Sequence, residues 1–459
     1  MMTMMCEAQR KRINNINMAH SEVKKFRQKM RITDYMPGQI TYHLGEYPKP
    51  FKIEPTEYDE NLIKSLKERG FEMIQVHSEW HDWLRLYGGD DYSSHDEEGM
   101  KNFVKLCHKY DMKVLIYLSS GFLDMTHPGF KEEFRRYSDA ILRGGFLNLA
   151  VCWHGSPEWR EFLWDKLFTA VERYGFDGIY NDMGYDWHNV KYFEHIKKYG
   201  SYNGEYDDLP YETELEDFLA MIYNECKRRG LIYKLHITGY GIPKADVKVY
   251  DYLWVGEGVR DVKEVISRCR GAEQYIVPAF DRRTSILDDL DLAYSCTLPF
   301  VQFPILYHGR PITQYGEVEG VTYYKSVEFD GEGNDFFERA VEHYEKTGEA
   351  TYSEWSSIPD DPQELERATR YLKLYKPMVT DESVVRIEIR EADFIKSEIP
   401  EDVYISLFTN EEQYLLVSNI TDADYELELK GEWVNRETNE CSTKFIVPKN
   451  KMLFLKQVQ

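Results

Sequence analysis

Short apolar runs alternate with amphipathic stretches along most of the chain. The runs are rich in β-branched and aromatic residues and are bounded by Gly, Pro, Asn or Asp, a pattern that predicts strands. There are eight of them: Gln39–Leu44, Met73–His77, Lys113–Leu118, Gly178–Asn181, Lys234–Thr238, Tyr252–Val255, Tyr275–Ala279 and Phe300–Tyr307.

Most of the stretches between these runs place apolar residues three and four positions apart, which predicts helices. Apolar strands that alternate with helices favour a parallel sheet with helices on its outer face, so we predict an α/β fold, a (β/α)8 TIM barrel over residues 36–380. A doubly wound sheet is the competing architecture, but Tyr42–Tyr47 is not the Gly-rich turn that normally follows its first strand. The predicted helices are Glu57–Arg69, His95–Tyr110, Pro157–Tyr174, Glu214–Arg229, Val262–Arg270, Leu287–Cys296 and Pro362–Tyr375.

From about Ser383 the pattern changes to alternating strands without long helices. Turn residues separate the strands, as they do in antiparallel hairpins. We therefore predict a small C-terminal antiparallel β-sandwich over residues 381–459. Its strands are Val384–Ile389, Val403–Thr409, Gln413–Asn419, Tyr425–Leu429, Lys444–Val447 and Met452–Leu455.

The chain is strongly acidic, with 57 Lys and Arg against 80 Asp and Glu in 459 residues, a formal charge of −23. Neither nucleic acid nor an anionic membrane surface is expected as a partner, and a neutral ligand fits better. Residues 1–35 are an exception: they form a basic segment, for which we predict a surface helix or poor order. The sequence leaves the oligomeric state open.

The cysteine pattern and the absence of long apolar runs indicate the cellular compartment. Seven cysteines form no CxxC pair, and most lie within predicted helices or strands, where reduced thiols are usual. The sequence has no segment typical of a signal peptide and no run of about 18 apolar residues. We therefore expect a cytoplasmic protein.

Ionisable side chains gather where the predicted strands end. Asp182 follows the fourth strand, and active sites of barrels lie at the carboxyl ends of strands, so Asp182 is a candidate catalytic residue. A ring of acids in a half-closed cavity is costly unless it has a purpose. The alternative for Asp182 is a cap on the next helix or turn. Other strand ends supply Glu79, His236, Glu257, Asp281 and His308.

Tryptophans are frequent near the same strand ends. Flat aromatic faces combined with a few polar groups suit a ligand that has apolar C–H faces and hydroxyl edges, most simply a sugar. We expect Trp80, Trp187 and Trp254 to line a carbohydrate site, with packing between barrel and helices as the alternative for each. Neither a cofactor nor a metal is expected in this site.

The segment Gly175–Asp182, with the sequence GFDGIYND, resembles the strand-four motif of barrel glycoside hydrolases of the α-amylase, α-galactosidase and α-fucosidase kind. A β-sandwich after the barrel is common among them. The resemblance implies that Asp182 is the nucleophile. Tyr180 stands where α-amylases have an Arg, and Ser119-Ser120 replaces the Asn-His of their strand-three motif. An acid on strand six, Glu257, is closer to the α-galactosidase-like arrangement.

The resemblance further implies a retaining glycoside hydrolase, with Asp182 as nucleophile and Glu257 as general acid/base. Their carboxyl groups are then expected about 5–5.5 Å apart. Glu79, His236 and Asp281 would bind sugar hydroxyls. The alternatives are an ion pair with Arg282 for Asp281, an ion pair with Arg260 or Arg282 for Glu257, and a structural histidine in the barrel rim for His236. The resemblance also favours α-linked substrates.

Two other functions remain open from the sequence. One is a metal-dependent barrel hydrolase that would use the neutral imidazoles and carboxylates of His77, His81, Asp82, His236 and His308 as ligands. The other is a non-catalytic carbohydrate-binding protein on a degenerate hydrolase barrel. Metal content distinguishes the first, and sugar binding without turnover distinguishes the second.

Overall fold

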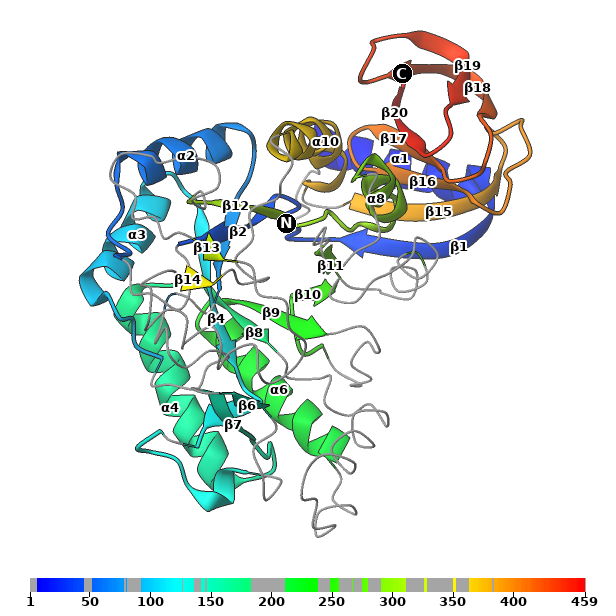
Figure 1. Cartoon of the computed structure of the whole chain (residues 1–459). Coiled ribbons are helices and arrows are strands. Elements are labelled where there is room, and N and C mark those ends of the chain that lie inside the picture. Colours follow the sequence, from blue (N-terminus) through cyan, green and yellow to red (C-terminus); the bar gives the residue numbers. More distant parts are fainter. Residues whose placement is uncertain are drawn as a thin grey trace. The chain divides into compact units, whose positions relative to one another are not determined.

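The computed structural model describes residues 6–44, 52–77, 80, 92–125, 127–135, 142–144, 147–182, 211–237, 248–255, 266, 275–279, 290–310, 326–327, 350–351, 363–381 and 384–458. The chain divides into two compact units (Figure 1). The barrel unit comprises Gln39–Val255 and Ile305–Pro362. The other unit, here called the β unit, comprises Met1–Gly38, Gly256–Pro304 and Gln363–Gln459.

Eight strands form one sheet in the order β11-β10-β9-β8-β4-β3-β2-β12. The pairs β10–β9, β9–β8, β8–β4, β4–β3, β3–β2 and β2–β12 are all parallel. The first and last strands in sequence, β2 and β12, are neighbours, as closure of a barrel requires. The predicted (β/α)8 barrel is thus confirmed. The strands are β2 (Gln39–His43), β3 (Met73–Val76), β4 (Lys113–Ser119), β8 (Gly178–Asp182), β9 (Ile232–Ile237), β10 (Tyr252–Val255), β11 (Tyr275–Pro278) and β12 (Leu306–Gly309).

Helices cover the outer face of this sheet, as contacts between the layers show. The Tyr42 ring of β2 packs 5.1 Å from Phe103 of α3, and Trp159 of α4 donates to the carbonyl of Ser120 at 3.1 Å. Local sequence sets the ends of α4: Ser156 accepts from the N3 amide, and Gly175 ends the helix at φ 77°. The helices are α2 (Glu57–Glu68), α3 (Glu97–Lys109), α4 (Pro157–Tyr174) and α6 (Tyr211–Arg228).

A small antiparallel sheet is inserted between β4 and α4. It has the order β5-β7-β6, formed by β5 (Phe122–Asp124), β6 (Leu142–Gly144) and β7 (Leu147–Val151). Two further short strands of the barrel unit, β13 (Ser326–Val327) and β14 (Ala350–Thr351), pair with each other. The hydrophobic pattern predicted neither sheet.

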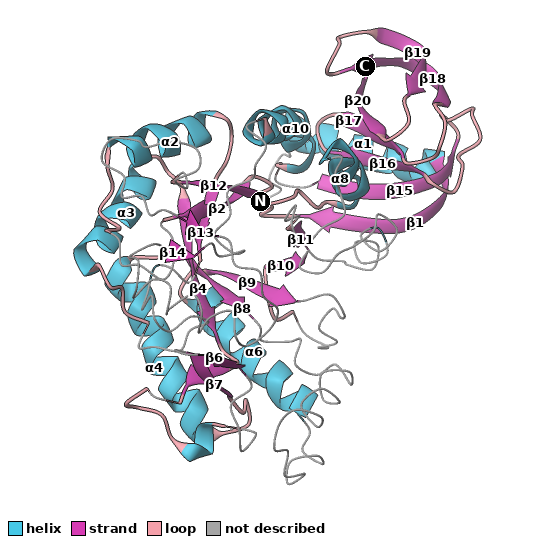
Figure 2. Ribbon diagram, in the orientation of Figure 1, coloured by secondary structure: helices cyan, strands magenta, loops and turns pink. Residues whose placement is uncertain are grey.

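The β unit contains a seven-stranded antiparallel sheet in the order β1-β15-β16-β17-β20-β18-β19 (Figure 2). The predicted C-terminal antiparallel domain is thereby confirmed. The helical elements described in this unit are α1 (Glu7–Glu22), α8 (Leu290–Thr297), the 3-10 turn η4 (Leu298–Phe300) and α10 (Glu364–Val379). Its strands are β1 (Val23–Ile32), β15 (Val384–Ala392), β16 (Val403–Thr409), β17 (Gln413–Asn419), β18 (Tyr425–Asn435), β19 (Cys441–Val447) and β20 (Lys451–Gln457).

The basic N-terminal segment forms both a helix and an edge strand. Strand β1 pairs antiparallel with β15, from Val23 opposite Ala392 to Ile32 opposite Val384. Its cations meet acids of the same unit: Lys24 pairs with Asp393 at 2.8 Å and Lys25 with Glu391 at 2.5 Å. These exposed ion pairs contribute little stability individually. They nevertheless show that acids of the same unit neutralise part of the positive charge of the N-terminal segment.

The structure departs from the predicted eighth strand, Phe300–Tyr307. Residues up to Phe300 form η4 instead, with Pro299 inside it, and Val301 adopts φ 63° before β12 starts at Leu306. Pro304 lies within the predicted strand, and a proline lacks the N–H that a sheet ladder needs, which explains why β12 starts only after it. The predicted helix Val262–Arg270 lies outside the described residues apart from Ile266. In the described part of the chain, no helix is long and apolar enough to cross a membrane.

Candidate active site

Asp182 is the last residue of β8, and side chains of both neighbouring strands hold its carboxylate. The Tyr117 hydroxyl of β4 donates to Asp182 Oδ2 at 2.5 Å. On the other side, Nδ1 of His236, from β9, makes a short hydrogen bond with Oδ1. Asp182 is 6% exposed, so its carboxylate is nearly removed from bulk water. Donors on both oxygens compensate for that burial.

The residues of β8 point alternately to the two faces of the sheet, as strand geometry requires. Tyr180 and Asp182 share the face that carries Tyr117 and His236. Asn181 lies on the opposite face, where its amide donates to the Ser120 hydroxyl at 2.8 Å and the Tyr233 hydroxyl at 2.7 Å. The Asp182 carboxylate therefore faces the barrel interior, whereas the Asn181 amide forms its hydrogen bonds on the face towards the helices.

Aromatic and imidazole rings surround the carboxylate. The His236 and Trp254 rings meet edge to face, with centroids 4.2 Å apart, and Tyr180 lies 6.0 Å from His236 and 5.7 Å from Trp254. The His77 ring stacks on Tyr117 at 6.0 Å and lies 5.7 Å from Tyr180. We call this group the Asp182 cluster: His77, Tyr117, Tyr180, Asp182, His236 and Trp254.

Polar groups also fill the barrel interior beside the cluster. Lys234, two residues before His236 on β9, is fully buried and donates to Gln39 Oε1 at 2.9 Å. Burial lowers the pKa of Lys234 well below its usual value. The buried Thr41 Oγ1 and Gln75 Oε1 have no hydrogen-bond partner among the described residues. Such buried polar atoms are normally satisfied by protein groups or ordered water.

His77 is affected by several of these charges together. Burial is the main cause that lowers the pKa of His77, to about 4; Asp182 opposes this effect, whereas Lys234 and His236 reinforce it. His77 is therefore a neutral imidazole near pH 7, with its Nε2 3.3 Å from Gln75 Nε2. His77, Asp182, Lys234 and His236 are thus close enough in the barrel interior to influence one another electrostatically.

Trp80 lies in the layer between barrel and helices. It is fully buried, its indole N–H donates to the Tyr117 carbonyl at 2.9 Å, and its ring packs on Tyr174 and Phe176 at 5.5 and 5.6 Å. These contacts correspond to the packing alternative. The structure therefore does not bring Trp80 into the Asp182 cluster, whereas Trp254 belongs to it with 2% exposure.

The structure does not bring His308 to the cluster either. His308 pairs in register with Tyr42, so the two side chains share one face of the sheet. Tyr42 packs on Phe103 and donates to Asp59 of α2 at 2.6 Å, which identifies this face as the helical one. Burial is the main cause that lowers the pKa of His308, to about 4, with a further contribution from Arg69.

Four predicted site residues lie outside the described part of the chain: Glu79, Trp187, Glu257 and Asp281. Their roles, and the predicted separation of Asp182 and Glu257, stay predictions. His81 and Asp82 of the metal-dependent alternative also lie outside it. Within the described ranges, no group of three or more His, Cys, Asp or Glu side chains could hold a metal ion.

Two members of the cluster, Tyr117 and Tyr180, were not singled out from the sequence as site residues. Both precede the strand ends, where attention falls on acids. The alternation of side chains along a strand could have identified Tyr180, which lies two positions before Asp182 and hence on the same face. Tyr117 needed the register of β4 against β8, in which Tyr117 lies opposite Tyr180.

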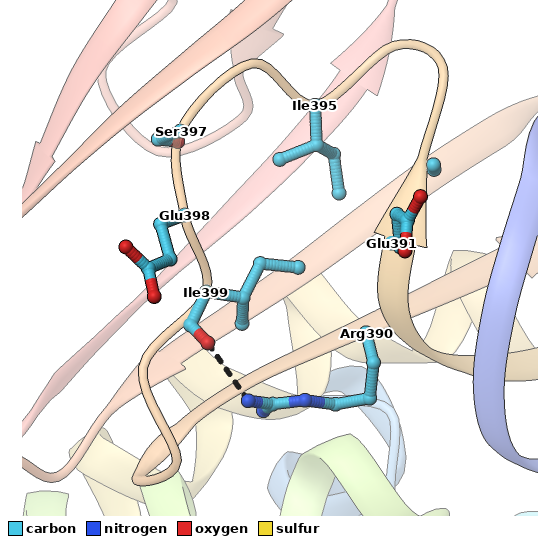
Figure 3. Close-up of a pocket in the computed structure, with 7 residues that line it drawn as sticks. Arg390, Glu391, Ile395, Ser397, Glu398 and Ile399 are labelled. Atoms are coloured by element: carbon cyan, nitrogen blue, oxygen red, sulfur yellow. Dashed lines mark hydrogen bonds between the residues drawn. The ribbon is translucent and has the colours of Figure 1, made fainter.

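The β unit contains a separate pocket of about 330 Å³. Arg390, Ile395 and Glu398 are among its lining residues (Figure 3). The Arg390 guanidinium donates to the carbonyls of Ile399 at 2.8 Å, Pro400 at 3.0 Å and Val403 at 3.1 Å. Backbone acceptors thus hold its cation in place, and none of the predicted site residues lines this pocket.

No protein-family model matches the chain, and no curated protein sequence matches it. Solved structures do. A noncanonic maltogenic α-amylase from Thermotoga neapolitana has a TM-score of 0.57 at 15% identity, covering 92% of this chain and 98% of that chain. Trehalose-6-phosphate hydrolase from Bacillus licheniformis has 0.57 at 11%, covering 93% and 100%. An isomaltulose synthase variant from Erwinia rhapontici, in complex with sucrose, has 0.58 at 14%, covering 92% and 98%. At these identities the likeness shows a shared fold.

Proposed function

We propose that the protein is a glycoside hydrolase whose nucleophile is Asp182. The observation that carries the proposal is the carboxylate of Asp182, at the end of the fourth barrel strand, held on both oxygens by Tyr117 and His236. Hydrogen bonds on both oxygens hold this carboxylate in a fixed orientation, and a carboxylate at this place in a barrel can act as a nucleophile on an anomeric carbon. The rings around it supply a setting suited to a sugar.

The reaction proceeds in two steps. Asp182 Oδ attacks the anomeric carbon while an acid protonates the departing oxygen, and water then releases the sugar from the carboxylate. We assign the acid/base role to Glu257, which follows β10 two residues after Val255. Retention of configuration follows from this pairing. The fold-related proteins are named for sugars, which supports a carbohydrate substrate.

The free thiols support a reducing, cytoplasmic location as part of the same proposal. Three cysteines in the described ranges are buried free thiols: Cys107, Cys152 and Cys226. Burial raises the pKa of the Cys107 and Cys152 thiols well above the usual value, so both resist oxidation.

A panel of nitrophenyl glycosides tests the activity, and Asp182→Asn tests the assignment. We expect turnover of the preferred glycoside to fall by several orders of magnitude in this variant, because the amide is a poor nucleophile of equal size. Thermal unfolding should show that the variant is folded.

Asp177→Asn is the matched control. Asp177 belongs to the same segment, but it precedes β8 and binds Lys113, His108 and the Val114 amide, at the end of the strand opposite Asp182. The control should keep its turnover at temperatures below its unfolding transition. Near wild-type activity of Asp182→Asn would refute the nucleophile. Sugar binding without turnover, unchanged by the substitution, would instead identify a non-catalytic barrel.

A further inference from the structure

The Asp182 carboxylate is held from both sides of its strand. In the resembled hydrolases an Arg stands two positions before the nucleophile, and here that position is Tyr180. We propose that Tyr117 and His236 are the positioning residues of Asp182, and that together they fix the orientation of its carboxylate. The proposal rests on the proposed function only in treating Asp182 as the nucleophile.

Each carboxylate oxygen has its own donor from a different strand. Tyr117 of β4 donates to Oδ2 at 2.5 Å, and His236 of β9 contacts Oδ1 through Nδ1. Strands β4 and β9 are the two neighbours of β8, so the donors approach from opposite sides. Rotation of the carboxylate would break both hydrogen bonds. Its orientation is therefore set before a substrate binds, which lowers the cost of reaching the reactive geometry.

Burial makes these two donors important for charge. Tyr117 is 3% exposed, His236 2% and Asp182 6%. A carboxylate removed from bulk water to this extent needs hydrogen-bond donors to replace the lost hydration. An ionised carboxylate only accepts hydrogen bonds, so in this arrangement the His236 proton lies on Nδ1. The two donors thus occupy both oxygens of the buried carboxylate.

The ring of His236 is itself fixed by its neighbours. Trp254 meets it edge to face at 4.2 Å and 90°, and Tyr180 stacks on it at 6.0 Å and 27°. The ring plane, and hence the direction of the Nδ1 proton, follows from these contacts. Trp254 and Tyr180 therefore act on Asp182 through His236.

Three variants separate a donor role from simple packing. Tyr117→Phe removes the hydroxyl and keeps the ring that stacks on His77 and meets Tyr180 edge to face. His236→Leu removes the N–H, whereas His236→Asn keeps an amide N–H near the position of Nδ1. We expect kcat to fall on the order of 10²-fold in Tyr117→Phe and His236→Leu with little change in KM. His236→Asn should recover most of the loss.

Tyr233→Phe is the matched control. It removes an equally buried hydroxyl from a barrel strand, but this hydroxyl binds Asn181 on the helical face. Its kcat should equal that of the wild type. Retention of wild-type kcat in Tyr117→Phe and His236→Leu would overturn the proposal, and so would equal losses in His236→Asn and His236→Leu.

A measurement without turnover separates this proposal from the proposed function. Thermal unfolding is compared for Tyr117→Phe in the wild type and in the Asp182→Asn background. If Tyr117 acts through the carboxylate, its substitution should lower the midpoint less in the Asp182→Asn background. Equal shifts in both backgrounds would overturn the positioning role. Coupled shifts in a protein that cleaves no glycoside would retain the positioning role and reject only the hydrolase assignment.

Discussion

Three histidines of the barrel unit, the buried His43 and His77 and the half-buried His308, remain neutral at pH 7 in the folded state. Burial is the main cause for each, and the resulting pKa is about 3 for His43, about 4 for His77 and about 4 for His308, against 6.5 for a free imidazole. Arg310 adds to the effect on His43, and Arg69 to that on His308. The unfolded chain therefore binds more protons than the folded chain below pH 6.5.

This difference predicts a loss of stability in mild acid. Above pH 6.5 the imidazoles are neutral in both states and cost nothing. As the pH falls from 6.5 towards 4, each should lower the free energy of unfolding by on the order of 1 kcal/mol per pH unit. Thermal unfolding between pH 7.5 and 5 measures the slope, which should be smaller in His308→Gln. A midpoint independent of pH over this range would contradict the prediction.

At the residue scale, the sequence predicted where Asp182 lies because strand and turn signals surround it on both sides. It could not predict what Asp182 touches. The partners come from β4 and β9, and only the sheet register brings Tyr117 and His236 to the same carboxylate. For Trp80 the predicted role was uncertain for a different reason, because a tryptophan after a strand can pack on either face of the sheet. Here it contacts the helical layer.

Two glycines near β8 serve different purposes. Gly178 begins the strand, and a Cβ there would lie 2.3 Å from the Ile232 carbonyl oxygen of β9. Gly175 ends α4 at φ 77° in open space. Gly178→Ala should therefore force β8 and β9 apart, whereas Gly175→Ala only strains the backbone.

Urea unfolding tests this distinction. We expect a loss of about 1 kcal/mol for Gly175→Ala, typical of a left-handed residue that gains a side chain, and a loss of roughly 2–4 kcal/mol for Gly178→Ala. Because Asp182 lies at the other end of β8, Gly178→Ala should also reduce turnover. Similar losses for the two variants would show that the close approach of β8 and β9 is easily relaxed.

At the element scale, the spacing of apolar residues and the turn and capping residues between segments predicted most strands and helices of both units. Helix α4 begins and ends at the predicted residues because Ser156 and Gly175 cap it. Elements without such signals were missed. The small sheet β5-β7-β6 and the strand β1 depend on pairing partners that the local sequence does not identify. Strand β1 was missed because its alternating Lys and Arg do not form a hydrophobic strand pattern. Charged residues are nevertheless typical of edge strands, where they prevent aggregation.

At the scale of the whole molecule, the barrel could be predicted because eight strands alternate with helices, but the division into units could not. Both units are discontinuous in sequence. In the β unit, β1 covers one edge of β15. A variant without residues 1–32 should expose that edge, because unpaired strands recruit other chains.

Size-exclusion chromatography and thermal unfolding test the role of β1. The shortened chain should form larger species than the full chain and unfold at a lower temperature. Removal of residues 1–5 alone, which precede α1, is the control and should change neither property. An unchanged size and midpoint after removal of residues 1–32 would show that β1 is dispensable for the sheet.

The pairing of β1 with β15 also bears on how the protein is made. Val23 is synthesised long before its partner Ala392, because the two residues are far apart in the sequence. At about 5–20 residues per second, the interval is roughly 20–70 s. Throughout that time β1 cannot form its ladder with β15, and its cations and Phe26 are without the sheet that they join in the folded protein. Capture of β1 by the sheet would then have to wait for the synthesis of β15.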